Sequence, residues 1–139
     1  MSEIKVDTLT GKTTANDITV TVGASATMSL EQGLAKAWLN YNHTTNTVRD
    51  SFGISTMTDV SSGIATANWS NNFNTANYAP LVMGDADPAS HYSSSATRST
   101  TNGSNAVFTT SAHQYLMHNL GASVLDSFYV TAQYCGDLA

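Results

Sequence analysis

Histidines and aspartates are the first residues to test for chemistry, because they supply most metal ligands and general bases. The four histidines, His43, His91, His113 and His118, are scattered along the chain. The spacing of His113 and His118 suits neither a metal-binding helix nor one face of a strand. We therefore expect structural or surface histidines and no metal site.

Asp85, Asp87 and His91 form the one local group that combines carboxylates with an imidazole. Alternate loop carboxylates could bind Ca²⁺, but the spacing of an EF-hand is missing. We expect solvated loop acids before Pro88, and ion binding by Asp85 and Asp87 stays open.

No pattern of a known catalytic mechanism is present. The sequence contains no Gly-x-Ser-x-Gly elbow, no phosphate-binding loop and no dinucleotide fingerprint. No pair of carboxylates stands out as the acid and base of a glycosidase. The single cysteine, Cys135, lies in an alternating strand pattern and predicts a buried free thiol. We predict a protein that is not an enzyme and needs no cofactor.

The composition predicts an all-β chain with an uncharged polar surface. Only 11% of residues are charged, whereas Ser, Thr and Asn supply 49 of 139 residues and favour strands and turns. A net charge of −5 without a basic cluster argues against nucleic-acid binding. No apolar stretch is long enough for a membrane span, and the first residues lack the pattern of a signal peptide.

Three segments are expected: an arm (1–27), a helix (28–42) and a β-rich head (43–139). In the arm, residues 4–9 and 17–22 alternate between apolar and polar side chains, which predicts two short strands joined by a polar loop. Two strands are marginal in water, so the arm needs a partner surface. The apolar residues expected to attach it are Ile4, Val6, Ile18, Val20 and Val22.

The helix is predicted from a capping box and an apolar stripe. Ser29 and Gln32 have the spacing of the box, and the stripe spans about three turns. The helix packs either on its own domain or against copies of itself on a three-fold axis. For the second case the predicted interface consists of Leu30, Gly33, Leu34, Ala37, Trp38 and Tyr41.

From residue 43 onward, short strands and turns predict an antiparallel β-sandwich. Residues 59–63, which end at Gly63, predict a turn, Pro80 favours an edge strand, and Val107-Phe108 predicts a further strand. The clearest strand is the last. Its predicted faces are Phe128, Val130, Ala132 and Tyr134 on one side and Tyr129, Thr131, Gln133 and Cys135 on the other. Residues 88–105 form a long polar segment, and such loops are often functional. The candidates there for contact with a receptor are His91, Tyr92, Arg98 and Asn102, although a solvated loop explains them too.

Several segments resemble a family of structural proteins from marine and other aquatic bacteriophages. They are residues 3–15, residues 29–42, the run Arg49-Asp-Ser-Phe-Gly-Ile-Ser55, then Asp59 and Asn77-Tyr78, and the ending Tyr134-Cys-Gly-Asp-Leu-Ala139. The resemblance covers most of the chain except residues 86–105. It implies a virion protein that forms a homotrimeric tail-fibre-like or head-fibre-like appendage.

The resulting hypothesis is a short trimeric fibre. Its arm would dock on other virion proteins, and its head would contact a host surface glycan or protein. The alternatives are a capsid decoration protein that stabilises the shell, a soluble carbohydrate-binding module and a carbohydrate-processing enzyme, which would need paired carboxylates or a metal in one pocket. The location on head or tail, the host and receptor, the docking partner and the strand order stay open.

Overall fold

A computed structural model describes residues 4–10, 18–22, 26–30, 33–85, 94–97, 108–118 and 124–139. These residues are mainly β, and none of them lies in a helix. The chain divides into two compact units, Met1–Leu34 and Ala35–Ala139. The N-terminal unit is therefore followed directly by the β-rich unit, without the separate helical segment predicted at 28–42.

The N-terminal unit contains one small antiparallel hairpin. Strand β1 (Thr19–Val22) pairs with β2 (Ala26–Ser29), and Val20 lies opposite Met28. The predicted strand at residues 4–9 is not formed, since residues 4–10 contain no strand. Ser29 ends β2 instead of capping a helix, and the amide of Leu30 donates a hydrogen bond to the Ile18 carbonyl at 2.7 Å.

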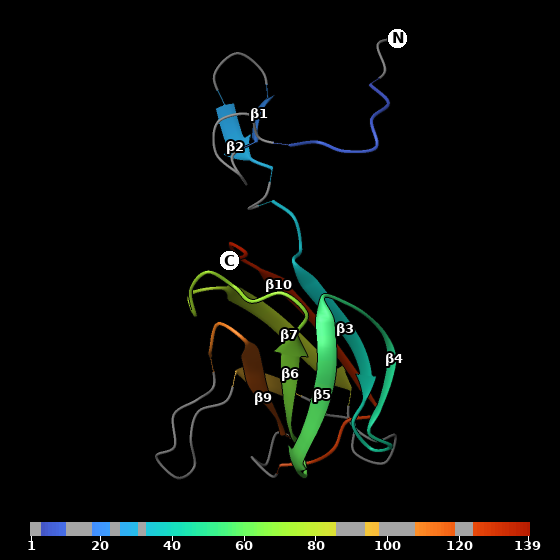
Figure 1. Cartoon of the computed structure of the whole chain (residues 1–139). Coiled ribbons are helices and arrows are strands. Elements are labelled where there is room, and N and C mark those ends of the chain that lie inside the picture. The colour runs from blue at the N-terminus through green and yellow to red at the C-terminus, as the bar shows by residue number, and fades with distance from the viewer. Residues whose placement is uncertain are drawn as a thin grey trace. The chain divides into compact units, whose positions relative to one another are not determined.

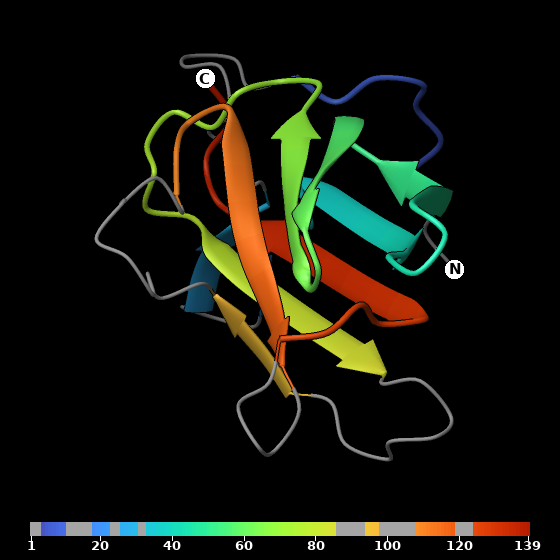
Figure 2. The ribbon, with the colours of Figure 1, turned by 90° about the horizontal axis from the view of Figure 1, so that it is seen from below.

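The second unit contains two antiparallel four-stranded sheets that pack face to face (Figures 1 and 2). The first sheet has the order β4 (Thr47–Phe52), β3 (Ala37–Asn42), β10 (Tyr129–Cys135) and β7 (Ala79–Asp85). The second has the order β5 (Ile54–Ser61), β6 (Ile64–Trp69), β9 (Ala112–His118) and β8 (Ser94–Thr97). The predicted mainly β, antiparallel architecture is confirmed.

The core between the sheets follows from alternation along the central strands. Every second side chain of β6, β9 and β10 is buried, as the period of two in a strand requires. Aromatic rings dominate this core, and Trp69 makes edge-to-face contacts with Phe73, Tyr78 and Tyr134. The largest fully buried side chains are Tyr41, Tyr115, Tyr134, Phe73, Leu39, Met117, His113, Val130 and Ser127.

The predicted helix is wrong, because residues 37–42 form the inner strand β3. Ala37, Leu39 and Tyr41 point into the core, whereas Trp38 and Asn40 are more exposed on the other face. Backbone pairing with β10 joins Ala37 to Tyr134 and Leu39 to Ala132. An isolated short helix is weak in water, so pairing along a whole strand and burial of alternate side chains override the local helical pattern.

Two glycines with positive φ make the turns at which the chain leaves β4 and β5. Gly53 has φ +71°, and a Cβ there would lie 2.6 Å from the Lys36 carbonyl oxygen. Gly63 has φ +67°, and a Cβ would lie 2.7 Å from the Met117 carbonyl oxygen. Both positions therefore require glycine for backbone conformation and for space.

Other expected strands are found. Val130, Ala132 and Tyr134 are buried in β10, as the alternation predicted. Phe128, predicted on the same face, precedes β10 and is 39% exposed. The turn ending at Gly63 joins β5 to β6, and Pro80 lies in β7, an edge strand of its sheet. Phe108 forms only an isolated bridge to His113 instead of a strand.

Candidate functional site

The six residues predicted at the trimer interface do not share one face. Ala37 and Tyr41 are buried in the sandwich core, so their side chains are not available to another copy. Trp38 points to the opposite side of β3 and is 37% exposed. Leu30, Gly33 and Leu34 belong to the N-terminal unit, where Leu34 is exposed and Leu30 is half-buried.

The predicted attachment residues show two levels of exposure. Ile4 is 87% exposed and Val6 is 60% exposed, whereas Ile18 and Val20 are half-buried in and beside the hairpin. The side chain of Val22 lies outside the described residues. So do all four receptor candidates, His91, Tyr92, Arg98 and Asn102, and the second loop acid, Asp87; Asp85 ends β7.

The described surface contains a groove on the outer face of the first sheet, with a volume of about 350 Å³. The backbone register builds it from two rows across β3, β10 and β7. One row aligns Trp38, Gln133 and Leu81; the next aligns Asn40, Thr131 and Met83. The central strand thus provides a hydroxyl and an amide at the floor, between one aromatic and one aliphatic wall.

The amide oxygen of Asn40 is a buried acceptor without a hydrogen-bond partner among the described residues. An unpaired buried acceptor costs roughly 1–3 kcal/mol. Rotation of the amide group about its Cβ–Cγ bond exchanges the positions of the oxygen and the NH₂ group. As placed, this oxygen is covered, so a hydroxyl or an N–H group of a ligand in the groove would reach it only after that rotation.

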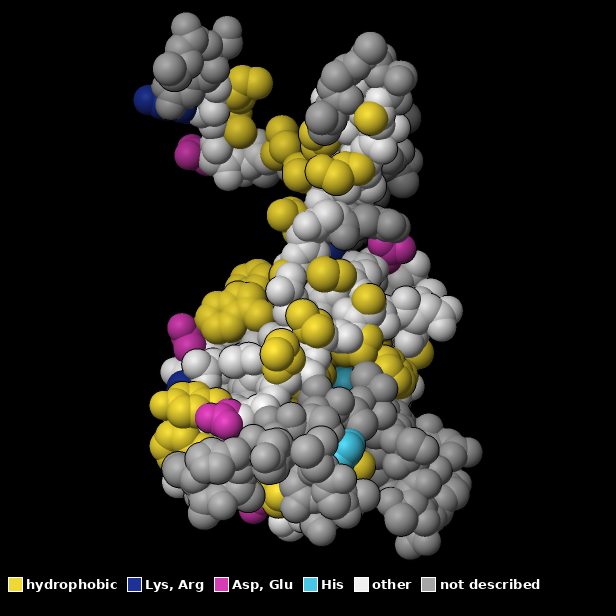
Figure 3. Space-filling view, turned by 180° about the vertical axis from the view of Figure 1, so that it is seen from behind, with side chains coloured by type: hydrophobic (Ala, Val, Ile, Leu, Met, Phe, Trp, Pro, Cys, Tyr) yellow, Lys and Arg dark blue, Asp and Glu magenta, His cyan; other side chains and the backbone are white. Residues whose placement is uncertain are grey.

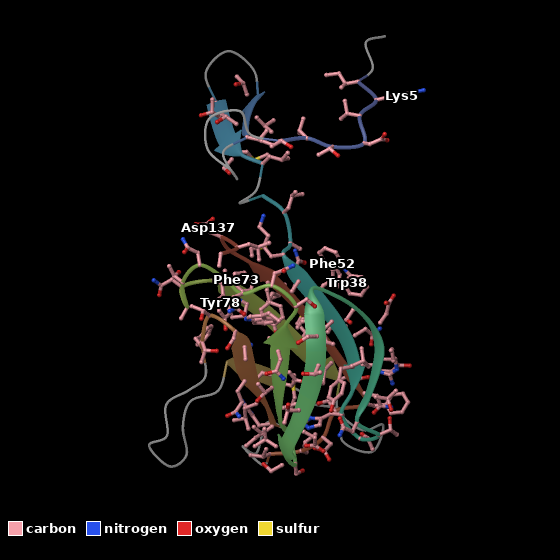
Figure 4. All side chains as sticks on the ribbon, in the orientation of Figure 1. Lys5, Trp38, Phe52, Phe73, Tyr78 and Asp137 are labelled. Atoms are coloured by element: carbon pink, nitrogen blue, oxygen red, sulfur yellow. The ribbon has the colours of Figure 1, made fainter. Side chains whose placement is uncertain are left out.

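Aromatic side chains extend this face beyond the groove. Phe52 is paired with Trp38 across β4 and β3, and the two rings lie near each other (Figure 4). Near the other end of β4, the Arg49 guanidinium carbon lies 4.2 Å from the Tyr129 ring centroid, and Arg49 donates a hydrogen bond to the Phe128 carbonyl at 2.7 Å. Seen from behind, hydrophobic side chains gather on the sandwich surface (Figure 3).

A second group, at one end of the sandwich, brings one histidine close to two carboxylates. His43 Nε2 lies 3.4 Å from Asp59 Oδ1 and 3.6 Å from Asp126 Oδ1, although neither contact has hydrogen-bond geometry. The Asp126 carboxylate accepts a hydrogen bond from the Gly63 amide at 2.6 Å. These contacts bring together segments that lie far apart in the sequence.

The buried titratable groups of the core are held uncharged. Burial lowers the pKa of His113 to about 4, and burial raises the pKa of Tyr115 and Tyr134 above the ordinary tyrosine value. Burial, and then the charges of Asp59 and Asp126, raises the pKa of Tyr41 to about 12. At neutral pH these phenols are protonated and His113 is neutral. They act as packing groups.

Within the described ranges, no group of three or more His, Cys, Asp or Glu side chains is arranged to hold a metal ion. None of the described segments forms a helix with the length and apolar character that a membrane span requires. The uncharged side chains of the groove can stack on a ligand and form hydrogen bonds with it, so the groove is suited to binding.

Sequence reasoning missed most of this groove. Of its residues only Trp38 was a candidate, and it was assigned to a helix. The alternation of Leu81 and Met83 in β7 shows that two large apolar side chains share the outer face, but which strands flank them depends on pairing with β10. The outward row of β10, which includes Thr131 and Gln133, was correctly separated from the buried row.

Comparisons of the chain with protein-family models, with curated proteins and with solved structures gave no match.

Proposed function

We propose that this chain is a structural protein of a bacteriophage particle. It forms a short homotrimeric appendage, attached to other virion proteins by its N-terminal unit. The β-sandwich carries the surface that meets the host. The motif resemblance across the chain motivates the proposal, and the surface of the N-terminal unit supports it.

The observation that carries the proposal is the exposure of apolar side chains in the N-terminal unit. Its two-stranded hairpin is too small to form a core of its own. Five large apolar side chains there are more than half exposed: Ile4, Val6, Leu9, Met28 and Leu34. Burial of one such side chain is worth roughly 1.5–3 kcal/mol. A unit of this kind gains most of its stability from a partner surface, either on other copies or on the particle.

The trimer contact is assigned to this unit and not to residues 37–42. Ala37 and Tyr41 already pack in the core of the sandwich, whereas Met28 and Leu34 present their side chains to solvent. We expect the purified chain to have a mass in solution of three times 14.7 kDa. Light scattering coupled to gel filtration measures this mass.

The variant Leu34→Asp places a charge in the proposed contact and should reduce the mass to that of a monomer. Leu81→Asp is the matched control, at a leucine of the sandwich that is 61% exposed against 52% for Leu34, and should leave the mass at the trimer value. A monomeric wild type would contradict the trimer.

Labelling of particles with an antibody against the sandwich tests the virion assignment. Labels at discrete appendages would support a fibre, whereas labels over the whole shell would indicate a decoration protein. Absence of the chain from purified particles would contradict both.

A further inference from the structure

We propose that the groove on the outer face of β3, β10 and β7 binds one ring of a neutral saccharide. The inference names the ligand class for the host contact proposed above. It rests on the proposed function only for the source of the sugar, because binding is a property of the isolated chain. The argument uses the shape, the charge and the hydrogen-bonding groups of the groove.

The shape suits a flat ring that stands on its edge. Neighbouring strands lie about 4.8 Å apart, so the walls on β3 and β7 are separated by about 10 Å at the backbone, with β10 between them. One wall presents the indole of Trp38, and the other presents Leu81 and Met83. A pyranose has C–H groups on both faces of its ring, so each face would meet an apolar wall.

The floor suits the edge of the same ring. Thr131 and Gln133 place a hydroxyl and an amide between the two walls. The amide oxygen of Asn40 is buried without a hydrogen-bond partner among the described residues. Sugar hydroxyls both donate and accept, so the perimeter of a pyranose can satisfy all three side chains.

The unpaired Asn40 oxygen favours a sugar over an apolar segment of another protein. An apolar side chain in the groove would leave this acceptor as unsatisfied as it is in the free chain, so the penalty of the unpaired oxygen would remain. A sugar hydroxyl removes the same penalty. The Asn40 oxygen therefore gains a hydrogen-bond partner only from a ligand that carries hydrogen-bond donors.

Charge selects a neutral sugar. None of the residues that line the groove is charged. The nearest carboxylate in the row of Asn40 belongs to Asp50, which pairs with Asn40 from the neighbouring strand β4 and lies outside the groove. The chain carries a net charge of −5. Anionic sugars and nucleotides would be repelled by the chain and would find no cationic partner in the groove.

The test is titration calorimetry of the full chain with neutral hexasaccharides of glucose, mannose, galactose and N-acetylglucosamine, and with an anionic hexasaccharide of galacturonate. At least one neutral probe should bind, and the anionic probe should not. Trp38→Ala should weaken binding about tenfold through loss of stacking. Asn40→Leu, which keeps the size of the side chain, should weaken it about fivefold.

Val60→Thr is the matched control, since Val60 is an exposed apolar residue of β5 in the other sheet. This variant should bind as the wild type does. Trp38→Phe retains a smaller ring and should give an intermediate affinity, which keeps the test valid if Trp38→Ala folds poorly.

Three results would overturn the proposal. In the first, no neutral hexasaccharide binds. In the second, binding occurs but survives both Trp38→Ala and Asn40→Leu, which would place the sugar elsewhere. In the third, these variants lower the mass of the full chain in solution while no sugar binds, which would make the groove an interface between copies. Location of the chain on particles affects none of these results.

Discussion

The two sheets of the sandwich share one core but have different outer faces. On the second sheet several outward polar side chains of β5, β6 and β9 bond to one another: Asn68 donates to Thr58 Oγ1 at 3.2 Å, and Gln114 donates to Thr66 Oγ1 at 3.2 Å. The same face also holds apolar side chains, among them Ile64 and Leu116, which pair across β6 and β9. On the first sheet the outward positions hold Trp38, Leu81 and Met83 beside an Asn40 oxygen that has no partner among the described residues.

The difference lies in the polar side chains: those of the second sheet satisfy one another, whereas the first sheet leaves an acceptor without a partner among the described residues. A polar row whose members satisfy one another gains little from a partner. An exposed apolar row loses contact with water when a partner covers it, and that loss favours binding. The inner faces of both sheets contribute to one core, so the contrast concerns the outer rows.

The largest effect on stability is expected from substitution of the tryptophans, because Trp69 lies in the core and Trp38 lies on the outer face. Trp69 is 5% exposed and contacts three aromatic rings, so Trp69→Ala should lower the free energy of unfolding by about 3–5 kcal/mol. Trp38→Ala should cost less than half as much, because Trp38 is partly exposed. Urea denaturation at one protein concentration measures both, and equal losses would contradict the division into core and outer face.

The next effect is a pH dependence of stability that arises from His113, which is buried on the inner face of β9. The pKa of His113 is about 4 in the folded chain and about 6.5 when unfolded, so folding favours the neutral ring. The contribution of the neutral His113 ring to the free energy of unfolding is fully present above pH 6.5 and declines as the pH falls towards 4. The loss should reach about 3 kcal/mol in the free energy of unfolding.

His113→Gln removes this titration. The variant should therefore show a shallower fall in stability between pH 6.5 and 4 than the wild type in the same denaturant series. Parallel curves would show that His113 is not the group that limits folding in acid.

A smaller difference in stability is expected between matched substitutions of two asparagines, one on each outer face. Asn68→Leu removes hydrogen bonds to the Thr56 carbonyl and to Thr58 Oγ1, and should lower the free energy of unfolding by about 1 kcal/mol. Asn40→Leu removes an unpaired oxygen and should be neutral or stabilising. If both variants lost the same stability, the contrast between the faces would be lost.

Much of the sandwich could be predicted from the sequence. The strict alternation in β10 identified its buried row, and Gly63 marked the turn between β5 and β6. These features are local: one strand and one turn carry their own signal in residue order.

The segment 28–42 could not be assigned in the same way, because its apolar residues fit two periods. Ala37 and Tyr41 fall on a helical stripe and also on one face of a strand. The choice is made by β10, which lies about ninety residues further along the chain and pairs with β3. A local sequence pattern does not show which strand pairs with it from so far along the chain.

The groove was beyond sequence reasoning for the same reason. Its rows combine side chains from β3, β7 and β10, and a shift of one residue in either register would turn a wall of the groove into the core. Composition indicated the uncharged polar surface. It could not indicate where apolar side chains interrupt that surface.

The most direct test of the account is an NMR titration of the full chain that follows the indole N–H signals of its two tryptophans. A neutral hexasaccharide that binds the chain should shift the signal of Trp38 in the groove and leave that of Trp69 in the core unchanged. Signals that both stay fixed throughout the series of neutral probes, or a shift of Trp69 alone, would contradict the assignment of the outer face of the first sheet as the binding surface.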